Sequence, residues 1–280
     1  MHILWDNAFF LVFTGFIVGT VGTLIGAGGG FIIVPFLIII HPALPTEILT
    51  AISIAVVACN AISGSVAYAR SKTIDYRAGR WFAAFTIPGS IAGVYSTAYI
   101  PKIVFHVVFG LLVIGLAALL FFQKKAIASS DSSPLLPESR KNTHTLMDAT
   151  GTVFTYEYRP YLGAFISLIV GYLSPILGIG GGIIHVPALV KWLGFPIRIA
   201  TATSHFILAV MATVSVIVHV VNGNYNGPHI MYWVVTLSTG VVAGAQLGAF
   251  LSHRVQGQWL IRILSVCLLL VGLRVLLSGV

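Results

Sequence analysis

Long apolar stretches separated by short polar segments recur along the whole 280-residue chain. There are five such stretches in each half, and most are long enough to cross a hydrocarbon core roughly 30 Å thick. In the first half they cover residues 6–24, 28–40, 48–69, 80–99 and 103–122. In the second half they cover residues 161–177, 180–193, 199–221, 230–251 and 263–279. The pattern predicts an all-α polytopic membrane protein.

A polar stretch, residues 123–160, separates the two sets of apolar elements. It contains the run SSDSSPLLPESRKNTHT, which is rich in Ser, Thr, Pro and charged residues. Such a composition is typical of an exposed, mobile linker. We therefore expect a first transmembrane repeat over 1–122, a cytoplasmic linker over 123–160 and a second transmembrane repeat over 161–280.

One glycine-rich segment occurs twice in the chain. The segment VGTVGTLIGAGGGFIIVPFL begins at Val18, and VGYLSPILGIGGGIIHVPAL begins at Val170. With a shift of 152 positions the two match at 10 of 20 residues. Weaker matches follow, such as Thr50 with Thr201 and Ser53 with Ser204. The chain therefore looks like a duplication, and apolar segments broken at corresponding places in two halves indicate a transporter's binding site.

The number of elements and the basic residues both favour an inverted repeat. Five elements is an odd number, so the second half enters the membrane in the opposite orientation. Loop 70–80 holds four basic residues, whereas its counterpart, 222–230, holds none. Placing loop 70–80 in the cytoplasm puts both termini outside and 13 of the 15 Lys and Arg residues inside, as the positive-inside rule requires. Two parallel repeats of four spans each are the alternative.

The second apolar element of each half is too short to span the bilayer. Residues 28–40 and 180–193 form helices of about 20 Å at 1.5 Å per residue. Each repeat therefore begins either with a re-entrant hairpin that has glycines at its tip or with a discontinuous, glycine-broken helix.

The glycines of these breaks are candidate binding residues: Gly28, Gly29, Gly30, Gly180, Gly181 and Gly182. A glycine run within lipid exposes main-chain polar groups that must face protein or a watery cavity. The helix after each break begins with unpaired N–H groups and a positive dipole end, which suit an anion. The alternative is that glycines only permit close helix packing. We prefer packing for the G-x-x-x-G pairs Gly89/Gly93 and Gly240/Gly244, and binding for the triple glycines.

Polar residues early in the third elements are further candidates for contact with the cargo. Thr50 and Ser53 match Thr201 and Ser204, and Asn60 lies two turns beyond. Three histidines, His185, His205 and His219, fall inside second-half spans, where ionisable residues are functional candidates, and we select His185 and His205. The alternatives are interhelical hydrogen bonds for the hydroxyl and amide groups, and a neutral histidine bonded to a backbone carbonyl.

Composition excludes several other classes of function. The chain is 58% hydrophobic and 8% charged, far below the roughly 25% charged residues of a soluble domain. The net charge of +8 comes from residues in short loops, so we expect no nucleic-acid partner. The sequence contains no H-E-x-x-H, G-x-S-x-G or Walker motif, and Cys59 and Cys267 both fall in apolar runs. We therefore expect no enzyme activity, no metal site and no cofactor.

The break motifs GAGGGFIIVP and GIGGGIIHVP, repeated in two halves, resemble the sulfite exporter TauE/SafE family, also known as the four-toluene-sulfonate uptake permease family. The resemblance covers about residues 8 to 278. It departs from an exact repeat at Ala27 and Ile179 and at His185, where the first half has Ile33. The resemblance implies transport of small sulfur-containing anions such as sulfite, thiosulfate, sulfoacetate or taurine, in either direction.

We therefore predict a secondary transporter of the inner (cytoplasmic) membrane that moves such an anion by alternating access. An anion channel with a glycine-lined constriction is the alternative. No Asp or Glu lies at the centre of a span, so a coupling proton would need a histidine, whereas a sodium ion could use carbonyl groups at the breaks. The sequence does not indicate an oligomeric state.

Overall fold

The computed structural model describes residues 7–121, 143–252, 265, 269–270 and 272–276. The helices, in chain order, are α1 (Ala8–Ile25), α2 (Gly30–Ile40), α3 (Thr46–Arg70), α4 (Tyr76–Thr97), α5 (Lys102–Phe121), α6 (Pro160–Leu177), α7 (Gly182–Lys191), α8 (Ile197–Val221) and α9 (Pro228–Ser252). Most of the tenth predicted element, 263–279, lies outside the described residues, as does Cys267.

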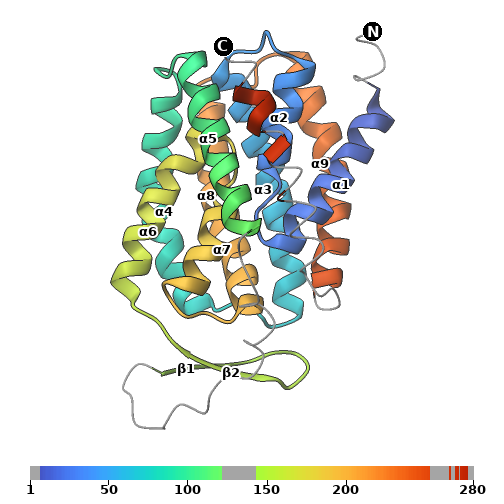
Figure 1. The fold of residues 1–280 in the computed structure, drawn as a ribbon. Helices are drawn as coiled ribbons and strands as arrows, with labels where there is room; N and C mark the ends of the chain where they lie inside the picture. The colour runs from blue at the N-terminus through green and yellow to red at the C-terminus, as the bar shows by residue number, and fades with distance from the viewer. Residues whose placement is uncertain (1–6, 122–142, 253–264, 266–268, 271, 277–280) are drawn as a thin grey trace.

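Five of the described helices are long and apolar enough to cross a membrane: α1, α3, α6, α8 and α9. The helices stand side by side in one bundle (Figure 1). Large apolar side chains such as Phe13, Phe165 and Phe250 are exposed on the outside of this bundle, where lipid would cover them. The prediction of an all-α polytopic membrane protein is confirmed.

Each glycine break is the tip of a helical hairpin. The helix α2 folds back along α1, so that the rings of Phe10 and Phe36 stack with their centroids 6.2 Å apart. In the same way α7 folds back along α6, where Ser167 Oγ lies 3.1 Å from His185 Nε2. Of the two arrangements that the sequence left open, both halves therefore have the hairpin.

Corresponding helices of the two halves run in opposite directions. The helices α3 and α8 pack against each other at the centre of the bundle. Tyr225, just beyond the end of α8, donates to the carbonyl oxygen of Ala51 near the start of α3, at 2.8 Å. At the other end, the N–H of Asp75, beyond α3, donates to Thr203 near the start of α8, at 3.0 Å. This antiparallel packing is what an inverted repeat requires.

Helices that correspond in the two halves also exchange partners. The first helix of each half packs along the fourth helix of the other, α1 with α9 and α6 with α4. A Cβ atom at Gly240 or Gly244 would overlap the carbonyl oxygens of Val12 and Phe16 on α1. Gly93 makes the equivalent approach to Tyr172 on α6. The G-x-x-x-G pairs therefore serve close helix packing, as we predicted.

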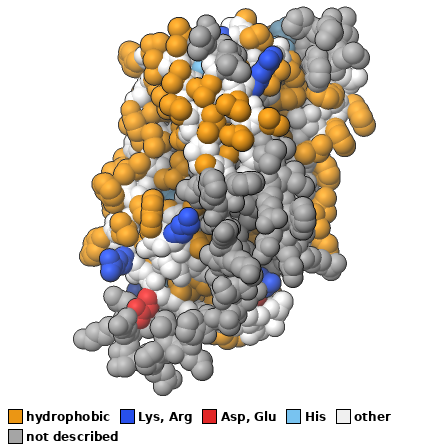
Figure 2. Space-filling model, viewed as in Figure 1, with side chains coloured by type: hydrophobic (Ala, Val, Ile, Leu, Met, Phe, Trp, Pro, Cys, Tyr) orange, Lys and Arg blue, Asp and Glu red, His pale blue; other side chains and the backbone are white. Residues whose placement is uncertain are grey.

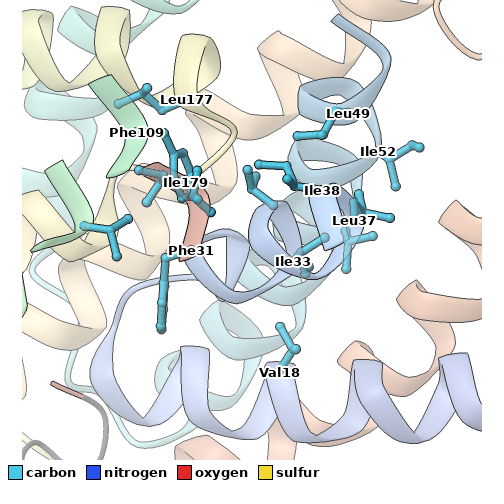
Figure 3. Close-up of a cluster of buried hydrophobic side chains, with 14 of the residues drawn as sticks. Val18, Phe31, Ile33, Leu37, Ile38, Leu49, Ile52, Phe109, Leu177 and Ile179 are labelled. Atoms are coloured by element: carbon cyan, nitrogen blue, oxygen red, sulfur yellow. The ribbon is translucent and has the colours of Figure 1, made fainter. Parts of the chain in front are cut away.

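Apolar side chains from both halves hold the hairpin tips together. Figure 3 shows Phe31 beside Ile179, with Leu177 nearby and Val18 of α1 below them. Phe31 is 0% exposed and Ile179 1%. Because these side chains come from both breaks, burying them fixes one tip against the other.

The structure differs from the expected linker over residues 143–157. There, β1 (Thr143–Met147) and β2 (Val153–Glu157) form an antiparallel hairpin that lies across one end of the bundle (Figure 1). Phe154 and Tyr156 alternate toward the bundle and are buried, and the ring of Tyr156 lies 4.7 Å from that of Phe195. The composition of 123–160 hid this period-two pattern, because the preceding residues are polar. The remainder of the predicted linker, 123–142, lies outside the described residues.

Basic residues gather at the end of the bundle that carries the β-hairpin. Ala149 in the hairpin turn bonds to Ser71, and Gly194 lies beside Glu157, so the loops after α3 and α7 both meet the hairpin. The charged side chains visible in Figure 2 lie mostly toward this end, below a largely hydrophobic wall. At the opposite end, Lys102 donates to the carbonyl oxygen of Pro42. The uneven distribution of basic residues among the loops of the sequence thus corresponds to a difference in charge between the two ends of the fold.

Candidate functional site

The two hairpin tips cross each other at the centre of the fold. A Cβ atom at Gly30 would overlap the carbonyl oxygen of Gly178, and one at Gly182 would overlap that of Gly26. These contacts are reciprocal, because position 30 corresponds to 182 and position 26 to 178 in the repeat. Only glycine allows two backbones to approach so closely. The structure therefore brings the two duplicated segments into direct contact.

Six glycines at the tips have backbone angles that other residues rarely adopt, and four of them belong to the triple glycines. The φ angles are +80° at Gly28, +86° at Gly29, +84° at Gly180 and +51° at Gly181. Gly29 and Gly181 are the residues before the first turns of α2 and α7, and neither cap makes a side-chain hydrogen bond. The triple glycines are therefore required both for the turn and for the close approach.

Several main-chain donors at the tips have no acceptor among the described residues. The N–H groups of Ala27 and Gly28 donate to the carbonyl oxygen of Gly22. Among the hydrogen bonds of the described residues, none uses the N–H of Gly29, Gly30 or Phe31, or of the corresponding Gly181 and Ile183. Buried main-chain donors are nearly always paired, so such a group of unpaired donors calls for an explanation. Donors at the first turn of a helix form an arrangement that binds anions.

The crossing is enclosed in this conformation. Every residue of both breaks, 26–30 and 178–182, is buried. A side-chain methyl of Val57 on α3 lies 3.1 Å from a Cβ position at Gly28 and 2.6 Å from one at Gly180. Leu208 on α8 packs against Gly28 from the other side, 2.5 Å from the same Cβ position. The two central helices therefore close the space around the tips.

Two predicted serines fasten each tip to the other half. Ser53 on α3 donates to the carbonyl oxygen of Gly178 at 2.6 Å. Its counterpart, Ser204 on α8, lies 3.5 Å from the carbonyl oxygen of Gly26. The hydroxyl groups thus hold the turns whose N–H groups are unpaired.

The two predicted threonines also lie against the tips, but mainly through other atoms. The hydroxyl of Thr50 donates back to Thr46 at 3.0 Å within its own helix, and its Cα faces Gly178. Thr201 turns a methyl group toward Gly26, 2.9 Å from a Cβ position there. Among the hydrogen bonds of the described residues, none directs the hydroxyl group of Thr50 or Thr201 at the crossing.

Asn60 and His205 meet in a buried polar cluster beside the end of α1. The hydroxyl of Thr23 donates to Asn60 Oδ1 at 2.8 Å, and His205 Nε2 lies 3.3 Å from the same hydroxyl oxygen. Tyr68 donates to the carbonyl oxygen of Thr23 at 2.9 Å, and its ring meets that of His205 edge-on. Two buried atoms of this cluster, Asn60 Nδ2 and His205 Nδ1, have no partner among the described residues.

The structure places His185 apart from this cluster. Its side chain is 2% exposed and bonds to Ser167 across its own hairpin, as described above. It therefore joins α7 to α6, whereas His205 joins α8 to both α1 and α3.

Comparison of the two halves did not reveal Thr23 and Tyr68. Their counterparts in the repeat are Pro175 and His219, so the duplicated pattern that selected Ser53 and Ser204 is absent at these positions. Only the fold shows that residues from α1 and α3 surround His205.

The helices of the bundle are long enough to span a membrane, and two glycine-broken hairpins cross each other at its centre. This is the architecture of a membrane transport protein. The chain belongs to the sulfite exporter TauE/SafE family, whose model matches residues 11–275. It is 31% identical over 276 residues to YunE of Bacillus subtilis, a probable membrane transporter protein, covering 96% of this chain and 97% of that protein. The family and the name of this relative support a membrane transporter rather than an enzyme.

A second relative agrees with this assignment. A probable membrane transporter protein of Methanocaldococcus jannaschii is 27% identical over 199 residues, which are 69% of this chain and 65% of that protein. No solved structure matches the chain.

Proposed function

We propose that the protein carries a small sulfur-containing anion across the cytoplasmic membrane by alternating access around the crossed hairpin tips. The cargo class comprises sulfite, thiosulfate and organosulfonates such as sulfoacetate or taurine. The observation that carries the proposal is the set of unpaired N–H groups at Gly29, Gly30, Phe31, Gly181 and Ile183. They begin α2 and α7, whose positive dipole ends meet at the crossing.

Main-chain donors suit this cargo because basic side chains lie elsewhere. In the described helices α1 to α9, Lys and Arg occur at or near helix ends, as with Arg70, Lys102, Lys191 and Arg198. An oxyanion with several oxygen atoms can accept from donors of both tips at once. The name of the family supports a sulfur oxyanion.

The packing around the tips supports a carrier over a channel. Val57 and Leu208 fill the space beside Gly28, so an ion cannot pass the crossing without movement of α3 or α8 relative to the hairpins. Each hairpin packs on a helix of the opposite half, α1 on α9 and α6 on α4. Such a symmetric arrangement has two equivalent ways to open, one toward each side of the membrane, which alternating access requires.

The proposed orientation places the β-hairpin end in the cytoplasm and both termini outside. The helix ends and loops at this end carry Arg70, Lys72, Arg77 and Arg198, whereas Lys102 lies at the other end. The positive-inside rule favours this orientation.

Counterflow in proteoliposomes tests the proposal. Vesicles loaded with unlabelled thiosulfate are diluted into radiolabelled thiosulfate, with sulfite, sulfoacetate, taurine and sulfate as competitors. We expect saturable uptake of radiolabelled thiosulfate that is faster into preloaded than into empty vesicles. Other sulfur anions should compete with the labelled thiosulfate. Single-channel currents in planar bilayers, without acceleration by preloading, would support a channel and contradict the carrier.

A further inference from the structure

An unpaired atom of His205 lies buried beside the first hairpin tip. The side chain is 0% exposed, and its Nδ1 has no hydrogen-bond partner among the described residues. The hydroxyl of Ser204, the preceding residue, lies 3.5 Å from the carbonyl oxygen of Gly26. His205 therefore follows directly, in the sequence, a residue that contacts the crossing. A buried polar atom without a hydrogen-bond partner destabilises the folded protein, unless it acquires a partner during the transport cycle.

The hydrogen bonds around His205 determine the chemical character of that atom. The hydroxyl hydrogen of Thr23 is used on Asn60 Oδ1, so the oxygen of Thr23 can only accept from His205. The Nε2 atom therefore carries the hydrogen in this arrangement, and Nδ1 is a bare lone pair. In this form Nδ1 accepts a proton and repels an anion.

Burial opposes a positive charge on His205, and one feature of its surroundings partly offsets this. The helix α1 ends at Ile25, and the carbonyl groups of its last turn, including that of Thr23, are the negative end of its dipole. The groups that face the ring are Thr23 from α1, and Gly64 and Tyr68 from α3, while Asn60 accepts from the same Thr23 hydroxyl. None of the described Asp, Glu, Lys or Arg side chains contacts it. A proton on Nδ1 is therefore favoured by a helix end but lacks a neutralising charge.

We propose that His205 is the proton-binding residue that couples the anion to a proton, so that the two cross the membrane together. Protonation of Nδ1 turns the lone pair into a donor, and the same cluster holds a second unpaired donor among the described residues, Asn60 Nδ2. An oxyanion then finds two donors and a positive charge, and the anion supplies the charge that the buried imidazolium lacks. The proton enters His205 from one side of the membrane and leaves it toward the other with the anion. This inference rests on the proposed function.

Proton uptake on binding tests the proposal directly. Thiosulfate is titrated into the purified full-length protein in two buffers that differ in ionisation enthalpy, at about pH 8, where a free histidine is mostly neutral. We expect the wild-type protein to take up close to one proton per thiosulfate. The variant His205→Asn, whose amide keeps a donor but cannot titrate, should take up none. Binding by the wild-type protein without proton uptake overturns the proposal, whatever the variant does.

Transport separates loss of coupling from loss of function. In proteoliposomes, a pH gradient should drive accumulation of thiosulfate by the wild-type protein, and His205→Asn should lose this accumulation, while any counterflow that remains no longer depends on pH. The control is His219→Asn, in the same helix and equally buried, about 21 Å along it at 1.5 Å per residue and bonded to Asn224. It should keep gradient-driven accumulation. Undiminished accumulation by His205→Asn overturns the coupling role, whereas absence of wild-type counterflow overturns the proposed function itself.

Discussion

The hydroxyl of Ser53 donates a 2.6 Å hydrogen bond to the carbonyl oxygen of Gly178, 125 residues away in the sequence. Ser53 belongs to the central helix of the first half, and Gly178 ends the first helix of the second half. One short bond therefore ties the central helix of one half to the hairpin tip of the other.

Replacing Ser53 by Ala should destabilise the protein by about 1–3 kcal/mol, because the carbonyl of Gly178 would stay buried without this donor. Thermal unfolding in detergent measures the effect as a lowered midpoint. Ser204→Ala is the matched control, since its oxygen lies 3.5 Å from Gly26 and makes a weaker contact. An equal or smaller effect of Ser53→Ala would contradict the importance of the bond.

Gly30→Ala and Gly182→Ala should each abolish counterflow while the protein still inserts and purifies. The added methyl group would overlap the opposing carbonyl of Gly178 or Gly26 and force the tips apart. Uptake by reconstituted variants is the measurement. Gly115→Ala serves as the control, because a Cβ there meets nothing within 4 Å. Normal transport by both tip variants would remove the crossing from the mechanism.

Gly29→Val and Gly181→Val test the backbone conformation at the hairpin tips. With φ of +86° and +51°, these positions strain any side chain, and a β-branched one most of all. We expect uptake to be lost in both variants while membrane insertion remains intact, as judged by the amount of folded protein on size-exclusion chromatography. Normal transport by both folded variants would contradict a functional role for the turns.

The sequence predicted the helices and the positions of the breaks, because both leave local signals. Apolar length predicts α3 and α8, and the triple glycines predict the turns. The contact of Gly30 with Gly178 follows from packing between halves, and no local pattern encodes it. The cluster around His205 was missed for the same reason, since Thr23 and Tyr68 become neighbours only when α1 crosses α3.

The β-hairpin was missed for a different reason. Its buried positions, Phe154 and Tyr156, alternate over only a few residues next to a polar run, so composition outweighed periodicity. The hairpin is stabilised by tertiary contacts with Asp75 and Phe195, which lie in different halves.

Docking of the β-hairpin should weaken at alkaline pH. Burial and the neighbouring Asp75 carboxylate, to which Tyr156 donates at 2.7 Å, both raise the pKa of Tyr156 above its usual value. The folded form therefore resists ionisation, and its stabilising contribution is complete below about pH 10 and falls as the pH rises beyond it. Limited proteolysis within 143–157 should accelerate above that pH.

Tyr156→Phe should make the same hairpin easier to cleave at neutral pH, by removing the bond to Asp75. It should also flatten the alkaline increase in cleavage, because the titrating phenol is gone. Tyr161→Phe, at a position that is 83% exposed, should leave both unchanged. A pH profile for Tyr156→Phe that matches the wild-type protein would show that this phenol does not hold the hairpin.

Cysteine labelling should place the two ends of the fold on opposite sides of the membrane. In a Cys59→Ala, Cys267→Ala background, Asn226→Cys should react with a membrane-impermeant maleimide in intact cells, and Arg77→Cys only after permeabilisation. Both positions are exposed, and they lie at opposite ends of the bundle, beyond α8 and in the first turn of α4. Reversed labelling would overturn the proposed orientation while preserving the antiparallel halves. Labelling of both from the same side would contradict the antiparallel arrangement itself, because the ends of α3 and α8 would then face one compartment.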